Sequence, residues 1–369
     1  LANPSETGYV FLRVRRPRSQ LAMTSSVVAQ VFDGPGQPFR PEQYPLPTPG
    51  PGERIVAIRC ATLCGSDVHT VEGRRHEPTP AILGHEGIGE VIAAGTGVEH
   101  DLGRRVTWTL ADSCGQCRFC QQLDLPQKCD DLFKYGHASL TDGTGLNGTY
   151  ASHVLLRRGT HVVDVPATIS DAVAAPANCA LATAAAAIDV LPDGVDRILV
   201  QGAGLLGLYA AALLRHRGVK SVWCCDPLKK RRQQVASWDV TAIHPEDVGK
   251  IDECDAVLEM SGYAPAVADG VQVLRIGGTY VFVGMVHPDS HLPLTGEQVI
   301  RKSLRLQGVH NYAPRHLNQA VDFLAELGQD DRLENLVSPP RPLAELSQAF
   351  EEARSQAWLR VAVAPDACL

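Results

Sequence analysis

The chain has 369 residues, of which 44% are hydrophobic and 20% charged, and its formal net charge is −7. This length and balance indicate two globular domains or one large one, with enough apolar residues for two cores. The negative charge excludes a general electrostatic attraction to nucleic acid or acidic membranes. Because no apolar run reaches the roughly 18 residues of a membrane-spanning helix and no secretory signal pattern is present, we expect a cytoplasmic protein without membrane or nucleic-acid partners.

The first 22 residues differ from the rest in charge, with four arginines against one acid. The stretch "MTSSVVAQVFDGPGQPF", which begins at Met23, is typical of the start of a domain. We interpret residues 1–22 as a disordered N-terminal extension rather than a transit-like segment, and we expect it to take no part in the fold.

From Val27 to about Val163 the chain is rich in glycine, proline and short runs of β-forming residues. Examples are "RIVAIRCATL", "GIGEVIAAG", "RVTWTL" and "SHVLL". Turn residues separate these runs, and this pattern predicts a mostly antiparallel β region.

From about Ser170 the pattern changes to helices and then to an alternation of strands and helices. The stretch "ISDAVAAPANCALATAAAAIDVL" predicts a helix that Pro176 interrupts. Predicted strands "RILVQG", "SVWCCD", "DAVLEM", "GTYVFVGM" and "LRLQGVH" then alternate with predicted helices "LLGLYAAALLRHRG", "LKKRRQQVASW" and "APAVADGVQVLR". This alternation predicts a parallel sheet with helices on both faces. Two more helices are predicted near the end, in "RHLNQAVDFLAELG" and "LSQAFEEARSQ".

The stretch "VQGAGLLGL" places Gly202, Gly204 and Gly207 in the GxGxxG spacing between a predicted strand and a predicted helix. Gly202 allows a tight turn, and Gly204 lets the backbone approach a pyrophosphate. Gly207 lets the helix pack closely on the strand, and the helix N-terminus offers N–H donors to phosphates. We therefore predict a dinucleotide site here and include Leu205 and Leu206 in it.

Asp226 ends the next predicted strand, nineteen residues after Gly207. A carboxylate at that place accepts hydrogen bonds from the adenosine ribose hydroxyls and repels a 2′-phosphate, so we predict NAD rather than NADP. The four basic residues that follow weaken this preference, and one of them, Lys230, is included among the cofactor-binding candidates.

Eleven cysteines are unevenly spaced, and without a secretory signal such thiols stay reduced or bind metal rather than form disulfides. Cys64, His85 and Cys179 offer the thiolate and imidazole ligands that zinc prefers. A catalytic zinc uses three protein ligands and leaves one position open. No short spacing links these three residues, so the set rests on their chemistry alone.

The stretch "SCGQCRFCQQLDLPQKCD" places four more cysteines within sixteen residues. Disulfides, a redox device and a metal cage are all open interpretations. A cage of four thiolates has no open position and would shape a loop without catalysing. The four residues are Cys114, Cys117, Cys120 and Cys129.

The motifs "CGSDVH", "GHEGIGEV", the four-cysteine loop, "GAGLLG" and "SLRLQGVHNY" occur in this order. Together they resemble the zinc-containing medium-chain dehydrogenase/reductase family of the alcohol dehydrogenase type, from about Met23 to the end. The resemblance implies an α/β fold with two domains. A GroES-like, mostly-β catalytic domain would comprise residues 23–177 and 315–369, and a doubly wound Rossmann NAD-binding domain would comprise residues 178–314.

The resemblance also implies the roles of individual residues. Cys64, His85 and Cys179 would bind a catalytic zinc, with Glu86 beside them as an alternative ligand. Asp67 would fix the His85 ring through its other nitrogen.

Two further residues would move the proton. Ser66 would hydrogen-bond the substrate hydroxyl, and His69 would pass the proton outward through the cofactor ribose. The zinc would stabilise negative charge on the substrate oxygen, and the nicotinamide would accept the hydride.

The four-cysteine loop matches the structural-zinc pattern of the family, which implies two zinc ions per chain. Eight residues separate Cys120 from Cys129, where seven are usual, and a glycine common in that gap is absent. A metal-free or oxidised loop remains the alternative.

Arg74 and Arg75 lie between the two zinc-ligand motifs. One interpretation is that both are simply exposed charges. The sharper hypothesis is that they attract an anionic substrate together with His310 and Tyr312, since arginine suits phosphate and carboxylate groups. The stretches "LPQKCDDLFKYGH", "VAAPANCALATA" and "GVHNYAPRHL" are similar to a subgroup found in phosphonate metabolism.

We therefore expect a zinc-dependent, NAD-linked alcohol dehydrogenase that acts on a small alcohol, aldehyde or ketone, including anionic ones such as a phosphonate. The family implies a homodimer or homotetramer. Three alternatives stay open: a polyol or sugar-alcohol dehydrogenase with Glu86 nearer the metal, a zinc-free quinone reductase, and a non-enzymatic redox or metal sensor.

Overall fold

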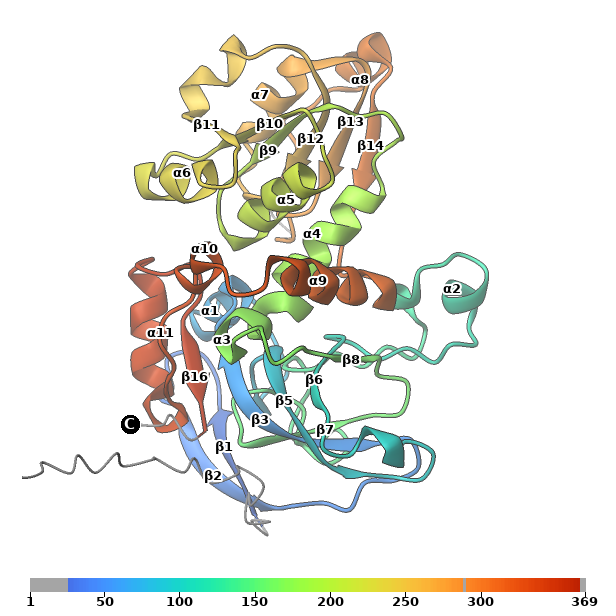
Figure 1. The fold of residues 1–369 in the computed structure, drawn as a ribbon, viewed down its shortest axis with the longest axis vertical. Helices are drawn as coiled ribbons and strands as arrows, with labels where there is room; N and C mark the ends of the chain where they lie inside the picture. The colour runs from blue at the N-terminus through green and yellow to red at the C-terminus, as the bar shows by residue number, and fades with distance from the viewer. Residues whose placement is uncertain (1–25, 288–289, 366–369) are drawn as a thin grey trace, which may run out of the picture.

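Two lobes, each built on its own sheet system, make up the computed structural model, which describes residues 26–287 and 290–365 (Figure 1). We call the lobe with the antiparallel strands the β lobe and the other the parallel lobe. The predicted extension, residues 1–22, lies outside the described residues.

The β lobe contains a seven-stranded sheet in the order β15-β16-β3-β5-β6-β8, with β7 paired to β3. Every pair in it is antiparallel except β15 with β16. The sheet takes strands from both ends of the chain, because β15 and β16 follow the parallel lobe in sequence. Its strands are β3 (Arg54–Thr62), β5 (Glu86–Ala94), β6 (Arg105–Trp108), β7 (His153–Leu156), β8 (Val162–Asp164), β15 (Arg341–Pro342) and β16 (Ala362–Ala364).

A three-stranded antiparallel sheet, in the order β2-β1-β4, completes the β lobe. Its apolar residues share a buried cluster with Ile55 of β3. The strands are β1 (Ser26–Phe32), β2 (Arg40–Pro45) and β4 (Ala81–Ile82). The helices of this lobe are α1 (Gly65–Val71), α2 (Arg118–Gln121), α3 (Asp171–Ala174), α9 (Pro314–Leu327), α10 (Asp331–Glu334) and α11 (Leu346–Arg354).

The parallel lobe has six strands in the order β11-β10-β9-β12-β13-β14, and all neighbours are parallel. Chain order reverses between β9 and β12, and in such sheets a ligand binds beyond the carboxyl ends of the strands at that point. This topology confirms the predicted doubly wound sheet. Its strands are β9 (Arg197–Gln201), β10 (Ser221–Cys225), β11 (Thr241–Ile243), β12 (Cys254–Glu259), β13 (Leu274–Phe282) and β14 (Arg305–Gly308).

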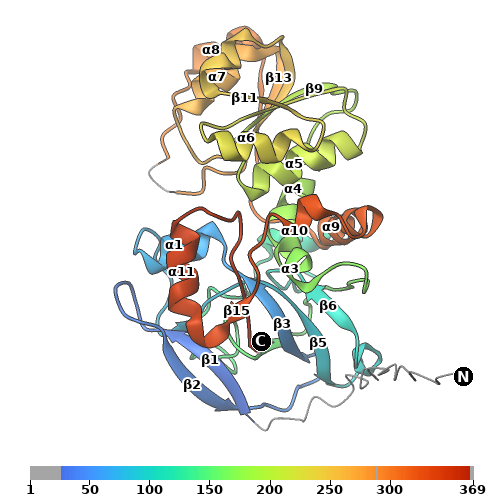
Figure 2. The same cartoon turned by 60° about the vertical axis from the view of Figure 1, so that its left-hand side comes forward.

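Helices α4 (Ala180–Asp189), α5 (Leu205–His216), α6 (Lys229–Ala236), α7 (Ala266–Val273) and α8 (Gly296–Lys302) belong to this part of the chain. Helix α4 leads from one lobe to the other in both views (Figures 1 and 2). It packs against α5 and α9, and its alanines are buried on nearly every side. Small side chains allow neighbouring helices to approach, so the residue that begins α4 is held firmly between the lobes.

The observed elements differ from the predicted ones in two respects and confirm a third feature. The predicted helix "APAVADGVQVLR" ends at Val273, because Leu274 already pairs with Cys254 in the sheet. The short elements β11 and α8 have no counterpart in the predicted order. The interruption at Pro176 is confirmed, since a 3₁₀ turn (Ala175–Asn178) separates α3 from α4.

Within the described residues, no single helix has both the length and the apolar character to cross a membrane. The bent pair Asp171–Asn178 and Ala180–Asp189 meets both conditions only when its two helices are taken together.

Candidate active site

The three predicted catalytic-zinc ligands come together at the junction of the lobes. Suitable atoms of Cys64, His85, Glu86 and Cys179 all lie within 4.8 Å of one another. The Sγ atoms of Cys64 and Cys179 are 4.0 Å apart. Two thiolates bound to one tetrahedral zinc at about 2.3 Å lie about 3.8 Å apart, so the spacing fits a metal and is too long for a disulfide.

The local structure explains why these residues meet. Cys64 directly precedes α1, His85 directly precedes β5, and Cys179 directly precedes α4. Each ligand therefore lies where a loop enters a regular element, and the element behind it fixes its backbone. Contact with Cys179 and the charge of Arg360 hold the pKa of Cys64 well below its usual range, which favours the thiolate that a metal needs.

Asp67 lies in the first turn of α1 and is 1% exposed. One of its oxygens accepts hydrogen bonds from the N–H of Cys64 at 3.0 Å and from the hydroxyl of Tyr150 at 2.9 Å. The other lies 3.5 Å from Nδ1 of His85, which has no hydrogen-bond partner among the described residues. This arrangement suits a carboxylate that orients a metal-binding imidazole.

Glu86 is fully buried, and it is held by two residues that the sequence did not indicate. Thr62 donates its hydroxyl at 2.6 Å, and Nε of Arg360 donates to both carboxylate oxygens at 2.9 and 3.1 Å. Arg360 also points Nη2 at Sγ of Cys64, 3.6 Å away. Burial raises the pKa of Glu86 to about 7, although Arg360 opposes this. The ion pair favours the reading of Glu86 as an electrostatic partner over that of a resting metal ligand.

Ser66 and His69 lie three residues apart on α1, and such residues share one face of a helix. Ser66 is half-buried and His69 exposed, so this face leads from the metal ligands toward solvent. Partial burial and the charge of Arg74 lower the pKa of His69. A neutral imidazole that can accept a proton is therefore favoured at physiological pH.

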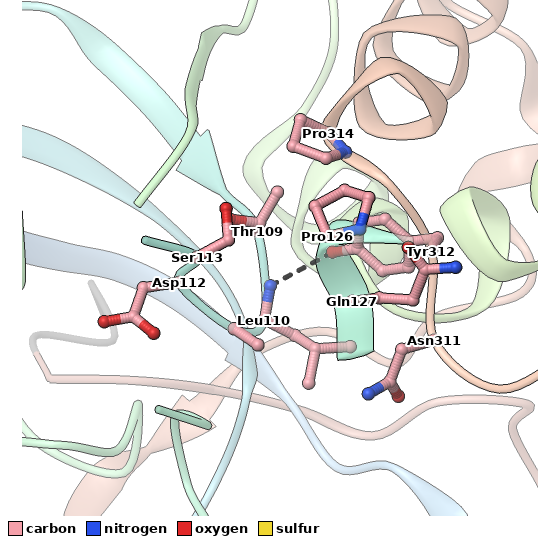
Figure 3. A pocket seen from close by; sticks show the side chains of 10 residues that line it. Thr109, Leu110, Asp112, Ser113, Pro126, Gln127, Asn311, Tyr312 and Pro314 are labelled. Carbon is pink, nitrogen blue, oxygen red and sulfur yellow. Dashed lines mark hydrogen bonds between the residues drawn. The ribbon is translucent and has the colours of Figure 1, made fainter. Parts of the chain in front are cut away.

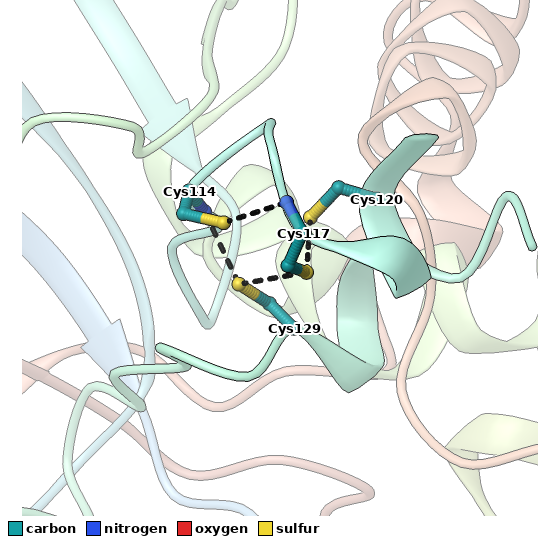
Figure 4. Close-up of side chains that lie close together, drawn as sticks. All are labelled: Cys114, Cys117, Cys120 and Cys129. Carbon is teal, nitrogen blue, oxygen red and sulfur yellow. Dashed lines mark hydrogen bonds between the residues drawn. The ribbon is translucent and has the colours of Figure 1, made fainter. Parts of the chain in front are cut away.

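The four loop cysteines form a second cluster, also with all sulfurs within 4.8 Å (Figure 4). Sγ of Cys117 lies 3.5 Å from that of Cys120 and 3.9 Å from that of Cys129, so neither pair is a disulfide. Backbone N–H groups point at the sulfurs, as they do around metal-bound thiolates: Cys114 and Asp131 donate to Cys129 at 3.2 and 3.4 Å.

The long gap before Cys129 contains no loose chain. Asp124 adopts a left-handed φ of 51°, and a 3₁₀ turn, Pro126–Lys128, leads directly into Cys129. The extra residue is thus taken up by a turn, and the fourth sulfur still reaches the other three.

The glycine motif has the geometry that a dinucleotide requires. Gly202 has φ +97°, and a Cβ on Gly207 would lie 1.8 Å from the carbonyl oxygen of Gly202. A Cβ on Gly204 would meet nothing within 4 Å, so the space before α5 is open to a ligand. The other motif members, Leu205 and Leu206, form the first turn of α5.

Asp226 is buried at the end of β10 and accepts N–H groups from Ala203 at 2.9 Å and Leu228 at 2.8 Å. Nη1 of Arg231 lies 3.6 Å from one carboxylate oxygen. Lys230 instead donates to the carbonyl of Ala357 in the β lobe. The cation beside Asp226 is therefore Arg231, which the sequence did not single out.

The four substrate candidates fall into different environments. Arg74 is paired with Glu72, whereas Arg75 lies 2.7 Å from Glu77. Glu77 in turn contacts Nδ1 of His137 at 2.9 Å, and the His137 ring stacks on that of His85 with centroids 5.0 Å apart. This chain of contacts links Arg75, but not Arg74, to the metal ligands.

Tyr312 is 4% exposed, and backbone groups occupy its hydroxyl. The hydroxyl accepts from the N–H of Leu110 at 3.1 Å (Figure 3). It also donates to the carbonyl of Asn178. We therefore withdraw Tyr312 as a substrate residue. The cavity beside it measures about 10 Å³, room for about one water, and none of the metal ligands lines it.

Comparisons with known proteins agree with this geometry. Residues 50–167 match the alcohol dehydrogenase GroES-like domain and residues 206–326 match the zinc-binding dehydrogenase domain. An L-threonine 3-dehydrogenase of Deinococcus radiodurans is 30% identical over 297 residues, which cover 75% of this chain and 80% of that one. A sorbitol dehydrogenase of Halalkalibacterium halodurans is 27% identical over 343 residues, covering 89% and 96%. The crystal structure of an alcohol dehydrogenase from Thermotoga maritima matches with a TM-score of 0.85 and 26% identity, covering 92% of this chain and 99% of that one.

We expect two zinc ions per chain, because both clusters offer a donor set that zinc prefers. Replacing Cys117 and Cys129 together by serine should lower the zinc content to one and lower Tm, since structural zinc contributes to folding. Elemental analysis and thermal unfolding check this. A wild-type content of one zinc, with the four loop thiols free to titrate, would contradict it.

Proposed function

The chain belongs to the zinc-containing medium-chain dehydrogenase/reductase family, and we propose that it moves a hydride between a small alcohol and NAD at the site where Cys64, His85 and Cys179 meet. The convergence of these three side chains in one cluster carries the proposal. A zinc ion held there would supply Lewis-acid stabilisation of charge on the substrate oxygen. NAD would receive the hydride in oxidation and return it to an aldehyde or ketone in the reverse direction.

The residues of the chain would position the reactants and move the proton. Ser66 would accept the proton of the substrate hydroxyl, and neutral His69, three residues further on α1, would take it toward solvent through the cofactor ribose. The buried pair of Glu86 and Arg360 would hold the charge around the ligands constant while the substrate oxygen changes charge. The open space before Gly204 would receive the pyrophosphate.

Among the alternatives, a polyol dehydrogenase of the same fold stays open, and the sorbitol dehydrogenase relative supports it. The pairing of Glu86 with Arg360 does not favour the version with Glu86 at the metal. The complete ligand sets argue against a zinc-free quinone reductase, and the dehydrogenase domains argue against a non-enzymatic sensor.

The proposal includes a phosphonate or other anionic substrate. It also includes a cytoplasmic location, because thiols stay reduced there.

Turnover of a panel of alcohols and aldehydes, neutral, polyhydroxylated and anionic, with NAD and NADP tests the proposal. We expect activity with NAD that falls at least about 100-fold in Cys64→Ser, because Lewis-acid stabilisation contributes several kcal/mol. Cys254→Ala is the control, since Cys254 begins β12, whereas the nucleotide motif lies beside the other end of that strand, where Glu259 pairs with Gln201. Full activity in Cys64→Ser, or in enzyme whose metal a chelator has removed, would contradict the proposal.

Cofactor choice should depend on the balance between Asp226 and Arg231. We expect Asp226→Asn to lower the ratio of kcat/KM for NAD to that for NADP by about tenfold or more, because charged hydrogen bonds to the ribose are lost. Arg231→Gln should shift the ratio the other way, because it removes the cation that a 2′-phosphate would use. Steady-state kinetics with both cofactors measure this, and an unchanged ratio in both variants would refute the assignment.

We also propose a homodimer, or a homotetramer built from such pairs. Strand β14 forms one edge of the parallel sheet and all of its residues are exposed. Ile276, Ile300 and Leu306, from β13, α8 and β14, are 70%, 80% and 41% exposed. An apolar, unpaired edge suits pairing with a second copy. Light scattering should give at least twice the chain mass, and Leu306→Lys should reduce it; a monomeric wild type would contradict the proposal.

A further inference from the structure

A half-buried lysine, Lys134, has no hydrogen-bond or ion-pair partner for its ammonium among the residues that the structure describes. The segment around it pairs with the end of β6: the N–H of Tyr135 donates to Leu110, and that of Asp112 to Phe133, both at 3.0 Å. The rings of Phe133 and Tyr135 contact each other at 5.4 Å in the core of the β lobe. Because neighbours on an extended chain point to opposite sides, Lys134 points away from that core.

The surroundings of Lys134 show what lies on that other side. Burial and the charge of Arg75 lower its pKa, whereas Cys179, Glu77 and Cys64 act to raise it. The ammonium therefore lies within electrostatic reach of both catalytic thiols. Across residues 26–287 and 290–365, no acceptor forms a hydrogen bond or ion pair with Nζ of Lys134.

More positive charge gathers at the same place. Nζ of Lys128 lies 2.7 Å from Nδ1 of His310. Burial, Lys128, Lys134 and Arg75 all lower the pKa of His310. Its imidazole is therefore neutral and can accept a hydrogen bond from the Lys128 ammonium. We call Arg75, Lys128, Lys134 and His310 the cationic cluster. Lys134 and Arg75 are half-buried, and Lys128 and His310 are exposed at its rim.

Within residues 26–287 and 290–365, Glu77 is the only acidic side chain that forms an ion pair with the cluster. Glu77 lies 2.7 Å from Arg75, but it also contacts His137, and burial raises its pKa. With Glu77 set against Arg75, the ammonium groups of Lys128 and Lys134 have no acidic partner among the described residues. Such an arrangement is unfavourable in a partly desolvated site unless an anion offsets it.

Resting on the proposed function, we propose that the cationic cluster binds an oxyanion group of the substrate, a phosphonate, phosphate or carboxylate carried a short chain away from the alcohol carbon. Contacts connect the cluster to the metal ligands, because Arg75 reaches His85 through Glu77 and His137. Arg74 takes no part, because its guanidinium is paired with Glu72.

The test compares three substrates of similar length in the zinc-loaded enzyme with NAD: 1-propanol, 3-hydroxypropionate and 2-hydroxyethylphosphonate. In Lys134→Met we expect kcat/KM for the anionic substrates to fall about tenfold or more relative to 1-propanol, mainly through KM, since a charged hydrogen bond is lost. Lys134→Arg should restore most of the preference. Lys220→Met is the matched control, because Lys220 is exposed and pairs with Asp196 far from the site.

The outcomes distinguish a failure of the proposed anion site from a failure of the proposed dehydrogenase function. An equal fall for all three substrates, a fall confined to KM for NAD, or a wild-type preference for 1-propanol would overturn the anion site and leave the proposed dehydrogenase intact. No turnover of any alcohol with NAD or NADP would instead sink the proposed function. The two anionic substrates separate a phosphonate from a carboxylate as the preferred group.

A second measurement avoids dependence on the folding of Lys134→Met. Methylphosphonate has no hydroxyl to oxidise, and it should inhibit oxidation of 1-propanol competitively in the wild-type enzyme. Lys128→Met, at the exposed rim, should weaken that inhibition several-fold, because one of the two uncompensated charges is removed. Inhibition that is absent, or equally strong in Lys128→Met, would count against the cluster.

Discussion

The geometry of the site depends on the hydrogen bonds that Asn178 makes. Its amide donates to the carbonyls of His85 and Trp108 at 3.0 and 2.9 Å, and its own backbone carbonyl accepts the hydroxyl of Tyr312. These groups are buried, so each unsatisfied one would cost about 1–3 kcal/mol. Because Asn178 directly precedes Cys179, the same bonds hold Cys179, just before α4, against His85, just before β5. The two lobes thus meet at a fixed distance where the metal ligands lie, and the alanine-rich α4 transmits this position into the parallel lobe.

The network continues from Trp108 toward the substrate side. Two residues on, Leu110 binds the Tyr312 hydroxyl through its N–H and accepts the N–H of Tyr135 through its carbonyl. Tyr135 is anchored further, since its buried hydroxyl contacts Thr160. Lys134 directly precedes this anchored residue. One connected set of hydrogen bonds therefore positions both Cys179, a candidate metal ligand, and Lys134, a cation of the proposed substrate site. Precise positioning of a substrate requires rigid support of this kind.

Local patterns made the parallel lobe and the donor residues predictable, whereas long-range partners were not. The glycine motif depends on one strand, one turn and one helix, so its spacing sufficed. Cys64, His85 and Cys179 have side chains that zinc prefers, but no spacing rule links them, and the family resemblance of their motifs implied the set. Arg360 lies 274 residues after Glu86 in the chain and belongs to no motif, so only the fold could bring them together. Tyr312 shows the opposite error: its place in a motif suggested a substrate contact, but sequence cannot show that backbone groups already occupy a hydroxyl. Elements of three residues, such as β11, carry too little periodicity to detect.

The four-cysteine loop also acquires a part in the chemistry, although its own site is closed. Lys128 directly precedes Cys129, and the turn Pro126–Lys128 that fills the long gap aims its ammonium at His310. Asp124 in the same loop pairs with Arg315 at 2.9 Å, at the start of α9. A cage that fixes Cys129 therefore also fixes the rim of the cationic cluster. The turn Pro126–Lys128 that takes up the extra residue of the gap therefore also determines where the Lys128 ammonium lies beside His310. On the proposed function, the four-cysteine loop contributes no ligand to the reaction, and its fold affects the substrate only through the position of this ammonium.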